Sequence, residues 1–441
     1  MRAQKNIWAE IDWITVALFL ALLLIGWLNI YAAGLQPEHP SMFDTSQEYG
    51  KQFIWIVSSL IIAQIILLVE GSFMRRTAWL MYGVVMLLLV LVLIFGREVN
   101  GAKAWFGFGS FGIQPSEFSK FTIALMLAHV LSQSTTRLQR LETKFVVAAI
   151  ILFPAMLIML QPDTGTVLVY AAFVLVLYRE GLSGNILFFG IIAAALSVLA
   201  LLFKEGVVNI PVIDVEVTGQ YVLMGAIAGV MLLGLWIVRR FVMPRIRKRA
   251  TWFLVLTCLG SILLIGSVDY FVENILEPHQ STRIKILLGL AEDPLGAGYN
   301  VNQSKTAIGS GGFSGKGFLQ GTLTRYKYVP MQSTDFIFCT IGEEWGFIGT
   351  SLVVILFTAL ILRLIFIAER QRSTFTRIYG YSVASIIFMH LLINVGMAIG
   401  LAPVIGIPLP FISYGGSSMW GFTILLFIFL KLDSERLYVL G

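Results

Sequence analysis

Residues 293–349 read DPLGAGYNVNQSKTAIGSGGFSGKGFLQGTLTRYKYVPMQSTDFIFCTIGEEWGFIG, a long polar and glycine-rich stretch. The sequence on both sides of it is built almost entirely of apolar runs. Asp335 stands where the polar stretch gives way to the next apolar run. Loops carry much of the function of proteins, and ionisable groups at membrane depth are costly. We therefore expect the chemistry of this chain in or beside the loop that Asp335 closes.

Composition excludes an ordinary soluble globule. Of the 441 residues 57% are hydrophobic and 13% are charged, whereas about 25% of a soluble domain is charged. Apolar runs of about 17–25 residues, long enough to cross a bilayer, occur at 12–33, 52–69, 78–95, 114–132, 144–160, 164–179, 185–203, 220–240, 251–272, 335–367, 377–402 and 411–432. The run 335–367 is too long for one straight span, so its first turns are expected at the interface. We predict an all-α polytopic membrane protein with about 12 transmembrane helices in a single integral membrane domain, residues 1–441.

The basic residues indicate the orientation of these helices. If the N-terminus is cytoplasmic, 20 of the 31 lysines and arginines fall in cytoplasmic segments, six of them between Arg239 and Arg249. The positive-inside rule then places both termini in the cytoplasm and the large loop 273–334 outside it. This distribution accounts for the net charge of +6 without nucleic acid, so we expect no nucleic-acid partner.

Residues 204–272 have the features of an insertion. The segment VVNIPVIDVEVTGQ (207–220) alternates apolar and polar residues, which predicts a small hairpin or a surface segment. The runs 220–240 and 251–272 then leave and return on one side of the membrane. Their removal would preserve every later orientation, so we predict an inserted helix pair in a ten-helix core.

Two acidic sites are candidates for chemistry, and each has a structural alternative. Asp335 could be a catalytic acid or could, like Ser333 or Thr334, cap the next helix; Glu343 and Glu344 follow it closely and favour a site. Glu117 and Lys120 lie at i and i+3 on one predicted membrane helix. They could bind a substrate or form a structural ion pair.

Three further motifs contribute candidate residues. Trp105 in NGAKAWFGFGS could contact a substrate or anchor the loop at the interface. Asp163 in QPDTGT could contact a substrate or cap the next helix. In PLPFISYGGSS (408–418), which includes Ser413 and Tyr414, Pro and Gly interrupt a membrane helix. Irregular backbone at membrane depth must be buried or line a cavity, so we expect a cavity there.

Other chemistries lack their motifs. The run AIGSGGFSGKG (307–317) is not a nucleotide-binding P-loop, because Ser310 replaces its first glycine and Gly317 replaces its Ser or Thr. These glycines are expected to allow close backbone approach to a substrate or another loop. The two cysteines, Cys258 and Cys339, predict no disulfide framework. The four histidines are isolated and are expected in loops or packed, with no spaced metal pair.

The set GAKAWF, QPSEFSK, QPDTGT, QSTDFIF and PLPFISYGGSS, in this order from residue 100 to 418, resembles the SEDS family (shape, elongation, division, sporulation). The loop reading GKGFLQGTLT is more similar to the elongation members than to the division members. The resemblance implies a glycosyltransferase that polymerises lipid II into peptidoglycan strands on the outer face of the bacterial cytoplasmic membrane. It also implies a class B penicillin-binding protein and other elongation-complex membrane proteins as partners.

Within this resemblance, Asp335 matches the catalytic aspartate, Glu117 and Lys120 the intramembrane pair, and Trp105 the outer-loop tryptophan. Ala104 departs from the arginine usual in the family, which puts a phosphate-binding role of that site in doubt. The extra helices within 204–272 are a second departure.

The reaction itself requires a base and a cation. A base must take the proton of the acceptor hydroxyl, and positive charge must stabilise the leaving diphosphate. Asp335 is the candidate base, while Lys305, Lys120 or a divalent cation (Mg²⁺ or Mn²⁺) could serve the diphosphate. Ser413 and Tyr414 are further substrate-binding candidates. The alternatives are a lipid II flippase, a division-type polymerase, and a scaffold for the crosslinking enzyme.

Overall fold

The computed structural model describes residues 10–35, 39, 41–99, 102–108, 111–133, 138–204, 207–210, 215–270 and 297–436, with 272, 274, 281–283, 285 and 290 between the last two ranges. These residues form two compact units, residues 1–182 with 300–441, and residues 183–299. Of the predicted loop 273–334, most residues before 297 lie outside the described residues. The part after it contains two helices.

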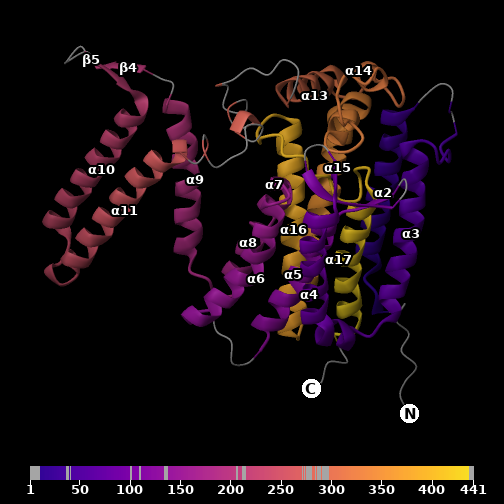
Figure 1. Cartoon of the computed structure of the whole chain (residues 1–441), viewed down its shortest axis with the longest axis horizontal. Coiled ribbons are helices and arrows are strands. Elements are labelled where there is room, and N and C mark those ends of the chain that lie inside the picture. Colours follow the sequence, from indigo (N-terminus) through magenta and orange to yellow (C-terminus); the bar gives the residue numbers. More distant parts are fainter. Residues whose placement is uncertain are drawn as a thin grey trace. The chain divides into compact units, whose positions relative to one another are not determined.

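The first unit is a helical bundle (Figure 1). Its long helices are α2 (Trp13–Gly34), α3 (Glu48–Leu68), α4 (Gly71–Phe95), α5 (Pro115–Leu131), α6 (Leu141–Met159), α15 (Ile337–Glu369), α16 (Thr374–Ala398) and α17 (Gly416–Ser434). Its shorter helices are α7 (Thr164–Val169), α8 (Ala172–Arg179), α14 (Thr322–Arg325) and, from residue 300 on, α13 (Ala297–Gly311). Helices α13 and α14 lie at the end of the bundle where α15 begins (Figure 1), and we call this the loop end.

Ten described helices are long and apolar enough to cross a membrane. They include α9 (Gly184–Lys204), α10 (Gly219–Phe241) and α11 (Pro244–Tyr270) of the second unit. Helix α5 has 17 residues, and the stretch Thr164–Arg179, which contains α7 and α8, is also shorter than the ten. The prediction of a helical polytopic membrane protein is confirmed, while the number of 12 spans stays a prediction.

Small antiparallel sheets accompany the helices. Strands β1 (Arg97–Val99), β2 (Ala102–Phe108) and β3 (Phe111–Ile113) form one sheet in that order. Strands β4 (Val207–Ile210) and β5 (Val215–Thr218) pair as a hairpin, which confirms one of the two alternatives predicted from the alternating pattern.

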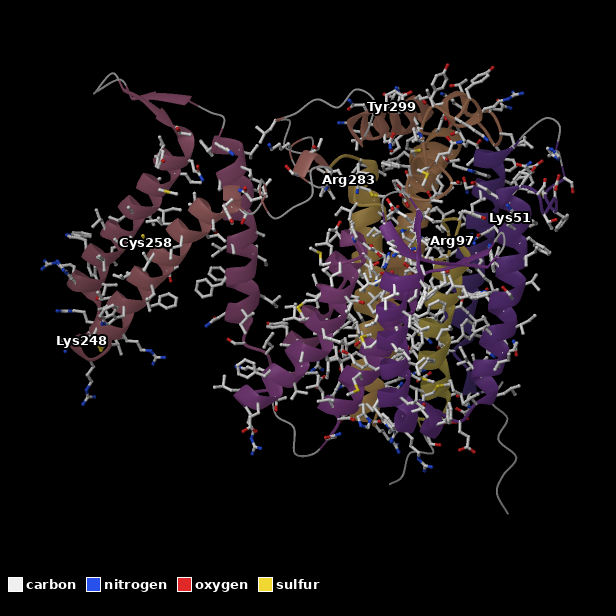
Figure 2. All side chains as sticks on the ribbon, in the orientation of Figure 1. Lys51, Arg97, Lys248, Cys258, Arg283 and Tyr299 are labelled. Carbon is white, nitrogen blue, oxygen red and sulfur yellow. The ribbon has the colours of Figure 1, made fainter. Side chains whose placement is uncertain are left out.

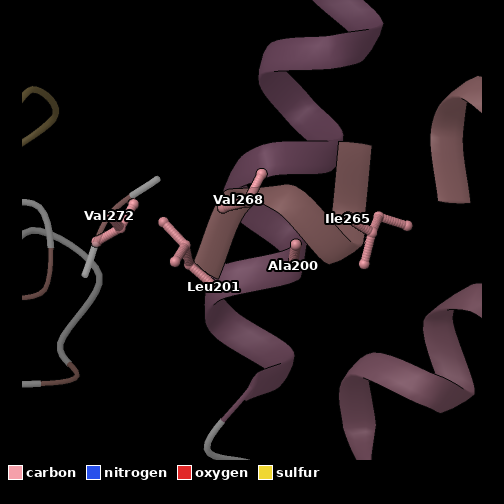
Figure 3. Packing of buried hydrophobic residues seen from close by; sticks show 5 residues of the cluster. All are labelled: Ala200, Leu201, Ile265, Val268 and Val272. Carbon is pink, nitrogen blue, oxygen red and sulfur yellow. The ribbon is translucent and has the colours of Figure 1, made fainter. Parts of the chain in front are cut away.

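The second unit has an apolar core of its own. Figure 3 shows this cluster, in which Ala200 and Leu201 of α9 lie with Ile265 and Val268 of α11 and with Val272. The unit therefore begins with α9 and contains more than the predicted pair α10 and α11. Figure 2 shows Lys248 near the turn between α10 and α11, and Cys258 further along α11. Cys258 and Cys339 are both buried and free. That α10 and α11 are inserted into a ten-helix core stays a prediction.

A backbone pairing interrupts α15 near its start. Gly346 has φ 64° and ψ −155° inside the helix, so the turns before it form a separate segment of the long run. That these first turns lie at the membrane interface stays a prediction. The run 311–317 pairs with this break: Phe347 N donates to the Gly312 carbonyl at 2.9 Å and Gly317 N to the Glu344 carbonyl at 2.9 Å. The glycines do allow close backbone approach, but the partner seen in the structure is the break in helix α15, whereas the prediction named a substrate or another loop.

Gly346→Ala is expected to disrupt this pairing. A Cβ at Gly346 would stand 2.3 Å from the Gly315 nitrogen, in a left-handed conformation that disfavours side chains. Such strain costs about 1–3 kcal/mol before any clash is counted, so the melting temperature of the purified protein should fall clearly. Gly309→Ala is the matched control, because a Cβ there would meet nothing within 4 Å. Equal melting temperatures of the two variants would contradict the pairing.

Candidate functional site

The segment before α15 holds Asp335 in irregular backbone. Residues 331–336 form turns, and the N-cap of α15 is Phe336, whose side chain makes no capping hydrogen bond. The N-cap is therefore none of the three residues suggested by the capping alternative. The Asp335 side chain is half-buried. Its Oδ2 lies 3.3 Å from the place that a Cβ of Gly406 would take.

The carbonyls around Asp335 are fixed by α16 and by residues 399–415, which we call the broken loop. Asn394 of α16 donates from Nδ2 to the Asp335 carbonyl at 2.9 Å and to the Ile407 carbonyl at 2.8 Å. Ser413 Oγ donates to the Thr334 carbonyl at 2.6 Å. Tyr414 N donates to the Ser333 carbonyl at 2.9 Å. The acid therefore sits on a backbone whose position is set by two other elements, as a preorganised group requires.

Glu117 and Lys120 form the buried pair that their spacing predicted. Lys120 Nζ lies 2.8 Å from Glu117 Oε2, with the two side chains 2% and 5% exposed respectively. Lys120 Nζ also lies 3.1 Å from His390 Nε2 and 4.4 Å from the centre of the Phe422 ring. His390 was expected to be a packed side chain, and it is buried, yet it is also a polar partner of Lys120.

His390 connects this cluster to the broken loop. Its Nδ1 lies 3.0 Å from the Pro408 carbonyl, so Nδ1 carries the proton and Nε2 accepts from Lys120. The sequence offered no signal for this contact, because Lys120 and His390 are 270 positions apart. The broken loop thus contacts Asp335 on one side and the Glu117–Lys120–His390 cluster on the other.

Asp163 has the structural role that its motif allowed. It is the N-cap of α7 and accepts from Thr166 N at 3.1 Å and Thr166 Oγ1 at 2.9 Å. It also accepts from Gln114 Nε2 and Ser116 Oγ, both at 3.0 Å. These four donors account for the placement of its carboxylate. Substrate binding by Asp163 stays a prediction.

Trp105 lies on β2 beside the start of α17. A Cβ at Gly112 would stand 3.0 Å from Trp105 Cε3, so the indole covers the neighbouring strand and is half-buried. Ser417 of α17 donates to the Gly112 carbonyl at 3.1 Å. Ala104 is fully buried, so this position presents no polar group to a substrate. Contact between Trp105 and a substrate stays a prediction.

Lys305 lies against the same broken loop as Asp335. It is an exposed residue of α13, and its Nζ lies 3.5 Å from the Cβ position of Gly400. Ser304 Oγ donates to the Ala398 carbonyl at 2.8 Å and ties α13 to the end of α16. Tyr414 is half-buried, and burial first and the Glu48 carboxylate second raise the pKa of its phenol, so it stays a hydrogen-bond donor at neutral pH.

In the sequence, Glu343 and Glu344 favoured a site at Asp335. In the structure, their side chains contact the segment around α14. Glu343 is fully buried. One of its oxygens accepts from Lys316 Nζ at 2.7 Å and Leu323 N at 2.9 Å, and the other from Thr324 N at 2.8 Å. Glu344 packs its Cγ 3.2 Å from the Cβ position of Gly321. Both acids therefore support α14 and its flanking turns.

Glu343→Gln is expected to loosen this loop. An amide has one acceptor oxygen, so its NH₂ group would face donors of either Lys316 and Leu323 or Thr324. Leaving buried donors unsatisfied costs about 1–3 kcal/mol, so tryptic cleavage after the exposed Arg325 should accelerate about tenfold or more. Glu98→Gln, at an exposed position of β1, is the control. Unchanged cleavage of Glu343→Gln would show that Glu343 does not order the loop.

The described residues contain no group of three or more His, Cys, Asp or Glu side chains that could hold a metal ion. Within the part of the chain that the structure describes, Asp335 therefore has no set of protein ligands around it that fits a divalent cation by itself. The expectation of Mg²⁺ or Mn²⁺ stays a prediction.

Comparison with known proteins gives one consistent family. The model of the FtsW/RodA/SpoVE family, described as cell cycle proteins, matches residues 12–213 and 220–438. Peptidoglycan glycosyltransferase RodA of Treponema pallidum is 33% identical over 97% of this chain and 99% of its own length. Peptidoglycan glycosyltransferase MrdB of Escherichia coli K12 is 29% identical over 94% and 92%. Stage V sporulation protein E of Bacillus subtilis is 32% identical over 92% and 93%.

Solved structures have the same fold. A chain from a structure described as the structural coordination of polymerization and crosslinking by a peptidoglycan synthase complex aligns with a TM-score of 0.65 and 25% identity, covering 97% of this chain and 98% of that one. The rod shape determining protein RodA of Thermus thermophilus aligns with a TM-score of 0.59 and 23% identity over 97% of each chain. The latter likeness concerns the fold alone.

Proposed function

Because this chain belongs to the FtsW/RodA/SpoVE family of cell cycle proteins, we propose that it is a peptidoglycan glycosyltransferase that polymerises lipid II for cell elongation. The observation that carries this proposal is the placement of Asp335 on a fixed, irregular segment against the broken loop. Relatives that align over most of this chain are named peptidoglycan glycosyltransferases RodA and MrdB.

The reaction joins an acceptor hydroxyl oxygen to the anomeric carbon of a lipid-linked sugar. The bond from that carbon to the diphosphate oxygen breaks, and the electron pair leaves with the undecaprenyl diphosphate. The hydroxyl proton must go to a base, and a half-buried carboxylate is suited to take it. Asp335 has this role in our proposal, and its supports from Asn394 and Ser413 keep it in position.

Lys305 is the better placed of the two candidate cations for the diphosphate. Lys120 is 2% exposed and already contacts Glu117 and His390. Lys305 is exposed and lies against the broken loop that also contacts Asp335. In our proposal Lys305 meets the leaving diphosphate, and the Glu117–Lys120–His390 cluster fixes the broken loop from within the bundle.

The proposed location is the bacterial cytoplasmic membrane, with both termini inside and the loop end outside. Basic residues gather at the opposite end and in the turn 239–249, as the positive-inside rule requires. A class B penicillin-binding protein is the proposed partner. The relative in a complex that coordinates polymerization and crosslinking supports this choice.

In vitro polymerisation tests the function. The purified protein in detergent, supplied with lipid II, should make glycan strands that lysozyme digests. A flippase would instead move lipid II only across sealed vesicles, and a scaffold would do neither. Lipid movement without any polymer, with or without the crosslinking partner, would refute the proposed activity.

A further inference from the structure

The turn between α10 and α11 concentrates positive charge. Two cations end α10 and four lie in the first turns of α11: Arg239, Arg240, Arg245, Arg247, Lys248 and Arg249. The sequence from residue 217 to residue 268 contains no Asp or Glu. The two helices therefore carry no acid of their own that could neutralise the turn between them.

Five of these six cations are exposed and unpaired with any described residue. Arg247 closes the turn, because its Nη2 donates to the Val242 carbonyl at 3.2 Å. The other five side chains are exposed and make no hydrogen bond or ion pair with the residues that the structure describes. Figure 2 shows Lys248 near the turn, where nitrogen-tipped side chains point away from the ribbon. These charges are accessible to an anion.

Membrane orientation accounts for only part of this charge. Arg239 and Arg240 lie in the last turn of α10, where cations satisfy the positive-inside rule and suit the negative end of the helix dipole. Arg245, Lys248 and Arg249 lie at the positive end of α11, where the dipole disfavours cations. Lys248 and Arg249 also follow Arg245 by three and four positions, so their charges repel it. A bound anion would relieve both effects.

Apolar side chains between the cations indicate that the turn lies at the membrane surface. Phe241 is 72% and Met243 75% exposed, and Ile246 is exposed as well. The exposed Trp236 and Trp252 lie about one helical turn, or about 5 Å, along the two helices from the nearest cations. Tryptophan is enriched at the headgroup level of a membrane. The cations next to these tryptophans therefore lie at the depth of lipid phosphates.

An anionic phospholipid fits both the charge and the apolar groups of this turn. Guanidinium and ammonium groups form charge-assisted hydrogen bonds with phosphate oxygens, and the exposed apolar side chains can pack against acyl chains. A nucleic acid or an acidic protein segment would use the cations but leave Phe241 and Met243 in water. Clusters of about four to eight basic residues next to the cytoplasmic end of a membrane helix are typical of binding to anionic lipids.

We propose that the α10–α11 turn binds the phosphodiester headgroups of anionic phospholipids in the cytoplasmic leaflet. Arg245, Lys248 and Arg249 are the main phosphate-binding residues, and the bound lipids anchor the second unit at a fixed depth. The site is separate from Asp335 and from the lipid II chemistry. The inference goes beyond the proposed function and shares with it only the membrane orientation.

The test variant replaces the three main cations and keeps the other three cations of the turn: Arg245→Gln, Lys248→Gln, Arg249→Gln. The matched control removes three exposed cations from separate segments of the first unit: Arg76→Gln, Arg140→Gln, Arg372→Gln. Both variants lower the net charge by the same amount, so only the position of the lost charge differs. A third variant, Arg245→Lys with Arg249→Lys, keeps the charge of the turn.

Native mass spectrometry of the full-length protein in detergent, titrated with phosphatidylglycerol, measures the binding. One cation near an anionic lipid surface contributes about fivefold in affinity, so the test variant should bind at least about tenfold more weakly than wild type. The control and the lysine variant should bind like wild type, because phosphate accepts from either kind of cation. Zwitterionic phosphatidylcholine should bind all four proteins equally.

Hydrogen exchange locates the site on the chain. Phosphatidylglycerol should slow the exchange of backbone amides in residues 241–246 of wild type and of the control, and inorganic phosphate should not. Equal affinity of the test variant and the control for phosphatidylglycerol would overturn the proposal, and so would protection by inorganic phosphate alone.

Single variants keep the proposal testable if the triple variant does not fold. Arg249→Gln should weaken phosphatidylglycerol binding about fivefold, whereas Arg76→Gln should leave it unchanged. Equal binding by these two variants would overturn the proposal as well.

This measurement uses no lipid II, so it is independent of the polymerisation assay. Phosphatidylglycerol binding that the test variant loses, in a protein that makes no polymer, would refute the proposed activity and leave the lipid site. Polymer formation by a protein whose test variant and control bind the lipid equally would refute the lipid site alone.

Discussion

Asp335→Asn should lower the rate of glycan polymerisation by about 100-fold or more, the range that a general base contributes. Asparagine has nearly the same shape and cannot accept the proton of the acceptor hydroxyl. The backbone carbonyl of residue 335 would still accept from Asn394, and the Ser413 bond to the Thr334 carbonyl would remain. The measurement is the initial rate with lipid II, together with the melting temperature of the purified protein.

Asp44→Asn is the control variant, because it removes the carboxylate of another residue, which lies near the start of α3. Asp44 accepts from Ser46 N at 2.9 Å and has no role in the proposed chemistry, so its variant should stay active. Asp335→Glu keeps the acid but moves it by one methylene, so it should retain partial activity. Near-normal synthesis by Asp335→Asn would remove the catalytic assignment and leave Asp335 a structural residue.

Breaking the buried pair on α5 should have the largest effect on stability. Lys120→Met leaves the Glu117 carboxylate buried without its cation, which costs about 3–5 kcal/mol in comparable sites. Glu117→Gln should cost less, because Lys120 keeps His390 Nε2 at 3.1 Å and the Phe422 ring at 4.4 Å. The double variant Glu117→Gln, Lys120→Met should be more stable than either single variant. Thermal unfolding in detergent measures all three.

The exposed pair Arg179–Glu369 provides the control. Its side chains are 45% and 50% exposed, and such pairs contribute about 0–1 kcal/mol, so Arg179→Met should change the melting temperature little. A double variant on α5 that is less stable than both singles would show that the pair is not mainly structural. Direct contact of its charges with substrate would then be favoured.

The sequence alone determined the helical membrane architecture and the motifs of the site. An apolar run of about 20 residues is a local property, and in a bilayer it has few alternatives to a helix. The i and i+3 spacing of Glu117 and Lys120 is equally local, which is why their ion pair could be predicted. The length of the run 335–367 indicated that it is not one straight span, but the position of its break, at Gly346 with a left-handed φ, came from the structure.

Only the tertiary structure decided which polar groups meet. Glu343 follows Asp335 closely in sequence, yet its carboxylate accepts from Lys316 and Thr324, because Asp335 lies in the turns before α15 whereas Glu343 lies on the helix itself. His390 joins Lys120 across 270 positions, and Gln332 reaches the end of α2 across 299. Such contacts depend on how helices rotate and pack against one another. No local pattern fixes that rotation, so the cluster could be found only in the folded chain.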